Sequence, residues 1–231
     1  MNLDKKQPLK DFGQIQLCQN YLKVEAEKNL KQQKKLVFNK HFVEREEYCI
    51  VNRNVDNGYI CFYEKKSSEF IYYLHLLLDS FIGRMMLYPE FASNVNVFKG
   101  QVTLKRLRDF PVITPSPKVI NAGICLDLSI KTIINLGGKE NDRLFLESAK
   151  YLMEELRDDF VMELYANDLF VGHNITIVEP LVEVVDNCKG MSLNEVAVHI
   201  MQSITAPDGA LLSNIRRFRV LLSSLNPKDS L

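Results

Sequence analysis

The sequence has no apolar segment long enough to cross a membrane, because its longest apolar runs, such as 70–78, reach only about ten residues. Its first six residues lack the apolar core that a secretory signal peptide needs. The five cysteines are an odd number and include no Cys-x-x-Cys pair, which indicates reduced thiols and no zinc site. These absences favour a cytoplasmic protein with no membrane contact and no bound metal.

The motifs that accompany nucleotide binding and common enzyme chemistry are also missing. The sequence contains no phosphate-binding P-loop, no Gly-x-Gly-x-x-Gly fingerprint and no Gly-x-Ser-x-Gly turn. It also lacks the Asn/Asp-Pro-Pro-Tyr/Phe tetrapeptide of adenine methyltransferases. The four histidines are scattered, and none belongs to a His-Glu-x-x-His zinc motif. We therefore expect no catalytic residues and no cofactor, so that the chain is not an enzyme by itself.

One tripeptide resembles part of a catalytic metal site. Glu64-Lys65-Lys66 matches the Glu-x-Lys end of a nuclease site, with Asp56 upstream. Such a site needs two carboxylates that bind one ion, with the lysine beside them. The tripeptide is common by chance, and Asp56 falls in a predicted turn. A nuclease built on Glu64 and Lys66 is therefore the weakest of three functional hypotheses.

The net charge of zero conceals two halves of opposite sign. Residues 1–120 contain 19 Lys and Arg against 13 Asp and Glu, a net charge of +6. Residues 121–231 contain 10 against 16, a net charge of −6. A basic first half attracts polyanions such as nucleic acid, whereas the acidic second half repels them. Ordinary variation in helical surface composition explains the same asymmetry equally well.

The first half has the pattern of mixed strands and helices. The predicted elements are a helix over 14–35, strands at 36–38, 48–51, 59–63 and 95–98, an apolar helix over 70–86, one helical turn at 104–109 and an extended segment at 110–117. Asn57-Gly58 favours a tight turn that joins 48–51 and 59–63 as a hairpin. Prolines restrain the segment 110–117 and remove backbone donors, so it cannot be helical.

The second half has the pattern of a helical protein. Its predicted helices cover 141–167, 179–187, 193–204 and 210–225, and the apolar segment 122–136 fits either a helix or a pair of strands. Ser192, with Glu195 three residues later, predicts a capping box. The predicted helix over 141–167 has an apolar stripe that consists of Leu152, Leu156, Phe160 and Leu164. This stripe fits a docking platform for an enzyme partner or a second copy of the chain, and it fits a bundle core equally well.

Residues 70–84 and 99–115 together resemble the closing part of target recognition domains in restriction–modification systems. These domains occur in type I specificity subunits and in the TaqI-like specificity domains of type IIG enzymes. In that family an apolar helix ends in a Ser-x-x-Gly-like turn, and a Gly/Ser-x-x-x-Leu-Lys-x-Leu turn and a proline-containing strand follow. Here the matching residues are Ser80 to Gly83, Gly100 to Leu107 and Phe110 to Pro115. Residues 145–165, which end in Glu-Leu-Tyr, are similar to the helix that follows this domain in many type IIG-like methyltransferases.

This resemblance implies an α+β fold, with a mixed β-sheet DNA-recognition domain over 1–136 and a helical docking or dimerisation region over 137–231. It implies sequence-specific recognition of double-stranded DNA, with N6-adenine methylation or cleavage performed by a methyltransferase or endonuclease domain or subunit elsewhere. Family members usually carry a methyltransferase domain before this region, so the chain would be a fragment or a separate subunit. The rival hypothesis is a protein–protein scaffold or regulatory subunit without DNA binding, in which the charged halves associate head to tail, giving a homodimer.

The DNA-binding prediction rests on the basic residues of the first half. The candidate contacts are Arg53, Asn54, Lys65, Lys66, Lys99, Lys105, Arg106 and Arg108. Cations on such a surface contact phosphates and provide affinity, whereas contacts to base edges provide sequence choice. Arg53 and Asn54 are the candidate base readers, because Arg bonds guanine and Asn bonds adenine through two sites each.

Overall fold

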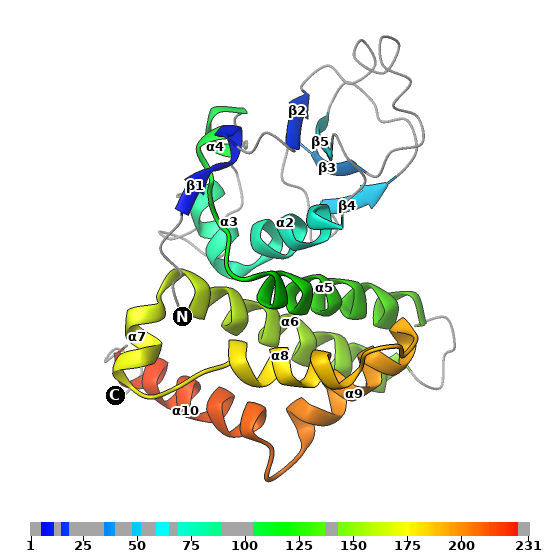
Figure 1. Cartoon of the computed structure of the whole chain (residues 1–231), viewed down its shortest axis with the longest axis vertical. Helices are drawn as coiled ribbons and strands as arrows, with labels where there is room; N and C mark the ends of the chain where they lie inside the picture. Colours follow the sequence, from blue (N-terminus) through cyan, green and yellow to red (C-terminus); the bar gives the residue numbers. More distant parts are fainter. Residues whose placement is uncertain are drawn as a thin grey trace. The chain divides into compact units, whose positions relative to one another are not determined.

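The computed structural model divides the chain into two compact units, Met1–Pro115 and Ser116–Leu231 (Figure 1). The structure describes the backbone of residues 6–11, 15–18, 35–39, 48–51, 59–64, 69–88, 104–136 and 143–225, and the side chains of 6–11, 69–88, 105–133 and 146–224. The domain boundary expected after residue 136 lies at the end of the first helix of the second unit.

The N-terminal unit contains two small sheets. Strand β1 (Lys6–Pro8) pairs with β6 (Pro111–Ile113), and the larger sheet has the order β2-β5-β3-β4. The strands of the larger sheet are β2 (Ile15–Cys18), β3 (Lys35–Asn39), β4 (Tyr48–Val51) and β5 (Tyr59–Glu64). Every strand pair in the described part of the chain is antiparallel.

Two of the elements expected in this region are wrong. The predicted helix over 14–35 is contradicted at Ile15–Cys18, which forms β2 and pairs residue by residue with β5. The predicted hairpin of 48–51 with 59–63 is also wrong, since β3 lies between these two strands and pairs with both. A turn signal indicates that the chain reverses, but it does not determine which strand occupies the neighbouring position. The turn itself, Asn57-Gly58, lies outside the described residues.

The expected α+β fold with a mixed-sheet recognition domain is contradicted as well. The described chain is mostly helical, and its strands have only three to six residues. A mixed sheet needs a parallel pair, which requires a long crossover connection, and the described pairs are all antiparallel. The apolar segment 122–136, for which a strand pair was an alternative, is part of a helix of 20 residues.

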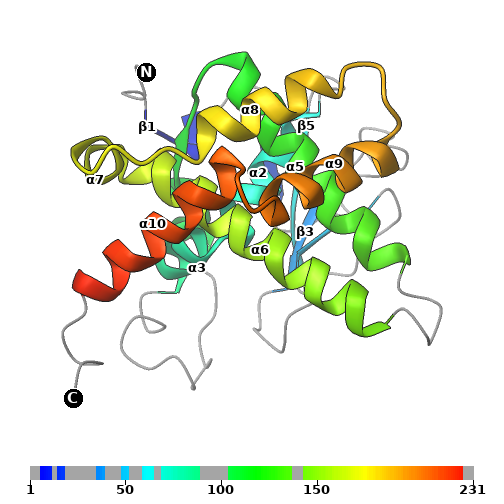
Figure 2. The same ribbon diagram turned by 90° about the horizontal axis from the view of Figure 1, so that it is seen from below.

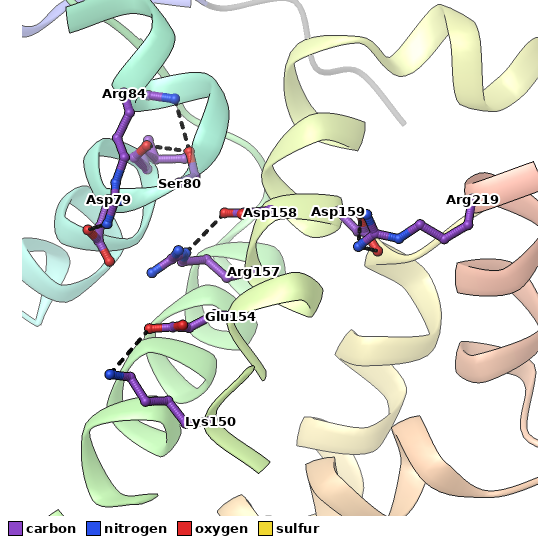
Figure 3. Close-up of polar contacts among 11 residues, drawn as sticks. Asp79, Ser80, Arg84, Lys150, Glu154, Arg157, Asp158, Asp159 and Arg219 are labelled. Carbon is purple, nitrogen blue, oxygen red and sulfur yellow. Dashed lines mark hydrogen bonds and ion pairs between the residues drawn. The ribbon is translucent and has the colours of Figure 1, made fainter. Parts of the chain in front are cut away.

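The apolar helix expected over 70–86 is broken into α2 (Phe70–Asp79) and α3 (Phe81–Leu87). Ser80 between them has an extended backbone and caps α3, because its Oγ accepts a hydrogen bond from the Gly83 amide at 3.1 Å (Figure 3). The same hydroxyl donates to the Leu77 carbonyl at 2.7 Å. A side chain at Gly83 would meet the carbonyl oxygens of Leu77 and Leu78, the second at 2.8 Å. Ser80 and Gly83 therefore build the break, which sequence periodicity did not reveal.

No single helix in the described part of the chain is long and apolar enough to cross a bilayer. The pair α2 and α3 meets these two requirements only when taken together, and it is bent by 75°.

The C-terminal unit is a bundle around a central helix. Its helices are α5 (Pro117–Leu136), α6 (Arg143–Tyr165), α7 (Asn167–Gly172), α8 (Val178–Asn187), α9 (Leu193–Thr205) and α10 (Ala210–Leu225). Helix α5 contacts α6, α8 and α9 (Figure 2). Pro117 occupies the first helical position, where its missing amide hydrogen costs nothing. The capping box of Ser192 and Glu195 at α9 is confirmed.

The apolar stripe on α6 belongs mostly to the core. Leu156, Phe160 and Leu164 are buried, whereas Leu152 is 37% exposed. The bundle-core alternative therefore explains three of the four residues, and the docking role of this region stays a prediction. Apolar side chains at this helical spacing are usually buried, since a helix of a globular bundle packs its apolar face against its neighbours.

Candidate nucleic-acid interface

Two segments that are distant in the sequence are joined in the N-terminal unit. One is β1 with the following 3₁₀ turn η1 (Leu9–Asp11), and the other is the short helix α4 (Leu104–Asp109) with β6. Strands β1 and β6 pair from Lys6 opposite Ile113 to Pro8 opposite Pro111. The Leu9 amide then donates to the Phe110 carbonyl at 2.9 Å, and the Leu9 side chain is buried. The segment 6–11 is thus held beside α4.

Helix α4 presents basic side chains on one side and anchors itself through the other. Leu107 is fully buried, while Lys105 and Arg108 are exposed. Arg106 is half-buried, and its guanidinium lies 3.4 Å from the Leu87 carbonyl oxygen, at the long limit of a hydrogen bond. The predicted helical turn at 104–109 is confirmed. The helical periodicity explains why Leu107 is buried while Lys105 and Arg108 are exposed, since these side chains leave the helix in different directions.

The segment from β1 to η1 adds two exposed lysines that sequence reasoning missed, and one of them, Lys10, contacts the end of this helix. Lys6 and Lys10 are both exposed. The Lys10 Nζ lies 2.8 Å from Asp109 Oδ1 at the end of α4. Nothing in the local sequence around Lys6 and Lys10 indicates this contact, because the pairing of β1 with β6 creates it. A prediction could have found it only by recognising 6–8 as a strand.

The carboxylates near these cations are few among the described residues. Asp109 lies at the end of α4, and Asp11 lies at the end of η1. The hydrogen bond from Lys10 lowers the pKa of Asp109, and the charges of Lys105 and Arg108 lower it further. The same hydrogen bond raises the pKa of Lys10. Lys10 and Asp109 are therefore charged together at neutral pH, and among the described residues of β1, η1 and α4 the lysines and arginines outnumber the aspartates.

The structure describes only three of the predicted DNA contacts. It brings Lys105, Arg106 and Arg108 onto one helix. The remaining predicted contacts lie outside the described residues: Arg53, Asn54, Lys65, Lys66 and Lys99. Of the hypothetical nuclease site, Glu64 ends β5, and Asp56 and Lys66 are outside the described residues. Within the part of the chain whose side chains are described, no cluster of three or more potential metal ligands occurs.

Three carboxylates are buried in the described part of the C-terminal unit, and two of them, Glu163 and Asp159, connect different helices, whereas Asp127 pairs with Lys131 on its own helix. Glu163 on α6 accepts hydrogen bonds from the amides of Ile177 at 2.5 Å and Val178 at 2.8 Å, where α8 begins. Burial raises the pKa of Glu163, and these backbone bonds oppose the rise. The carboxylate satisfies amides that have no partner inside their own helix. Sequence reasoning missed this cap, because Glu163 lies on a different helix from the one it caps.

The second buried carboxylate, Asp159, faces α10. Its oxygens lie 3.1 Å from the Arg219 guanidinium (Figure 3). The same guanidinium lies 3.7 Å from Glu155. Burial raises the pKa of Asp159 to about 7, and the nearby Arg219 opposes this effect. This group therefore titrates near neutral pH while it connects α6 to α10.

The comparisons with known proteins identify no relative. No family model, no curated protein and no solved structure matches this chain. The resemblance to target recognition domains therefore rests on the short motifs alone.

Proposed function

We propose that this protein binds double-stranded DNA through the basic face of α4 and serves as the specificity part of a restriction–modification enzyme. In this proposal another domain or subunit, a methyltransferase or endonuclease, carries the catalysis. The observation that supports it is the exposure of Lys105 and Arg108 on a helix whose opposite side is anchored by buried Leu107. Exposed cations on a held backbone suit phosphate contacts, which dominate affinity for duplex DNA.

In this proposal, the residues that recognise the DNA sequence differ from those that contact the phosphates. Arg53 and Asn54 are assigned to base reading by their chemistry, since each side chain can form a bidentate pair with a purine. The motifs around Ser80 and Gly83 and around Phe110 to Pro115 support the family assignment. The partner enzyme would rotate the target adenine out of the helix, because that step needs a closed catalytic pocket.

The proposal is tested by measuring duplex binding against salt concentration with the full chain. If about six phosphates are contacted, log K should fall against log salt with a slope near −5, from ~0.9 per contact. The variant Lys105→Glu/Arg108→Glu should bind more weakly, with a slope smaller by ~1.8, because two contacts are lost. Arg216→Glu is the control, since Arg216 is an exposed cation on α10 of the other unit.

The result that would overturn the proposal is equally specific. Binding that is absent in low salt, or that is identical in the wild type and in the Lys105→Glu/Arg108→Glu variant, contradicts DNA recognition by α4. Sequence specificity is tested with a pool of random duplexes, from which the protein should enrich a defined site. A pool that stays random after selection contradicts the specificity role and leaves only general binding to DNA.

A protein–protein scaffold is the second candidate function. It is favoured by apolar side chains at the surface of the C-terminal unit, where Val171, Val198 and Val220 are 68%, 54% and 69% exposed. Single exposed valines are ordinary, whereas a continuous apolar patch marks an interface. Sedimentation of the full chain distinguishes the two ideas: self-association that Val198→Ser or Val220→Ser abolishes, without any affinity for DNA, would favour the scaffold.

A further inference from the structure

The N-terminal segment that precedes the predicted site is held in a defined place. The pairing of Pro8 with Pro111 and the buried Leu9 side chain fix its backbone against the chain around β6. Inside the segment, the side-chain Nε2 of Gln7 donates to the backbone carbonyl of Asp11 at 3.1 Å. Lys6 and Lys10 are the exposed basic residues of this segment. A cation on an ordered backbone loses less entropy on binding than one on a free tail.

The ion pair of Lys10 places its ammonium group next to the cations of α4. Lys10 Nζ lies 2.8 Å from Asp109 Oδ1, and the charges of Lys105 and Arg108 also act on that carboxylate. Lys10 therefore bonds the aspartate, and Lys105 and Arg108 on the same helix are near enough for their charges to act on it. A lysine ammonium has three donors, so Lys10 can bond Asp109 and a phosphate oxygen at the same time.

We infer that Lys6 and Lys10 form a second row of phosphate contacts, which extends the DNA-binding face of α4 onto the segment from β1 to η1. This inference rests on the proposed function, and it adds residues that no local sequence motif indicates. Asp109 opposes binding on this face, and Lys10 offsets its charge. The chemistry recognised is the phosphate backbone, so these two lysines contribute affinity without sequence preference.

The test is the salt dependence of duplex binding for Lys6→Gln/Lys10→Gln in the full chain. Two lost phosphate contacts should reduce the slope of log K against log salt by ~1.8. The matched control is Lys118→Gln/Lys189→Gln, which removes two exposed lysines that flank Asp186 in the C-terminal unit at 2.7 and 3.2 Å. That variant carries the same change in charge and should leave the slope unchanged. Exposed ion pairs contribute little to stability, so both variants should fold.

Asp109→Asn provides a second and opposite readout. Removing this carboxylate should tighten duplex binding, because one negative charge leaves a surface that meets phosphates. Weaker binding by Asp109→Asn would show that the ion pair serves only to shape the surface, and would overturn the inference.

The outcomes separate the inference from the proposed function. If Lys105→Glu/Arg108→Glu weakens binding while Lys6→Gln/Lys10→Gln matches the wild type, the second row is wrong and the α4 site stands. If the wild type shows no salt-dependent affinity for DNA, the proposed function fails and the inference fails with it. Equal losses in Lys6→Gln/Lys10→Gln and in the Lys118→Gln/Lys189→Gln control would also overturn the inference, since they would reflect net charge alone.

Discussion

Asp159 predicts an unusual pH dependence for the stability of the C-terminal unit. Its side chain is 3% exposed, and burial raises its pKa from 3.8 to about 7. Between pH 3.8 and about pH 7, Asp159 is mostly protonated in the folded state and mostly ionised in the unfolded state. Stability therefore falls as the pH rises through this window, and it is regained on acidification.

The size of the stability change follows from the rise in the pKa of Asp159. At 1.36 kcal/mol for each pKa unit, the group should lower the free energy of unfolding by about 3 kcal/mol between pH 5 and pH 8. Asp159→Asn removes the titrating group and keeps its shape. The variant should therefore gain stability relative to the wild type as the pH rises from 5 to 8, by up to about 3 kcal/mol. The Arg219 guanidinium, 42% exposed, retains Glu155 and water as partners in the variant.

The assay is urea unfolding of the full chain at pH 5 and pH 8, followed by circular dichroism of the helices. Glu183→Gln, which removes an exposed carboxylate from α8, controls for the change in net charge. The opposite result is clear. If Asp159→Asn loses more stability at pH 8 than at pH 5, the ion pair with Arg219 outweighs desolvation, and the Asp159 pKa lies below its ordinary value.

Two further substitutions test how the units are built. Gly83→Ala should destabilise the N-terminal unit by about 1–3 kcal/mol, because a Cβ would press on the carbonyl oxygens of Leu77 and Leu78; an unchanged melting temperature would contradict the close approach of α2 and α3. Glu163→Ala should cost about 1–3 kcal/mol in urea unfolding, since it removes the one oxygen that accepts from the amides of both Ile177 and Val178. A loss no larger than that of the exposed control Glu183→Ala would argue against the capping role.

Helices with a local start or stop signal were predictable from the amino acids alone. The predicted bounds of 210–225 match α10, and the predicted capping box at Ser192 starts α9. Helix α6 (Arg143–Tyr165) lies within two residues of the predicted bounds 141–167 at both ends. The extended conformation of Pro111–Ile113 also followed from proline chemistry. These features depend on neighbours within a few residues, so the local sequence contains the information that specifies them.

Contacts between distant segments were not predictable in the same way. The position of β3 between β4 and β5, the capping of α8 by Glu163 and the approach of Lys10 to Asp109 each join residues far apart in the chain. The same is true of the conversion of 15–18 from helix to strand, since its pairing with β5 supplies the hydrogen bonds. Local propensities differ by about 1 kcal/mol or less per residue, and packing and strand pairing readily outweigh them. The amino acids therefore specified the helical bundle and the charge of each half, while folding determined which cations share a surface.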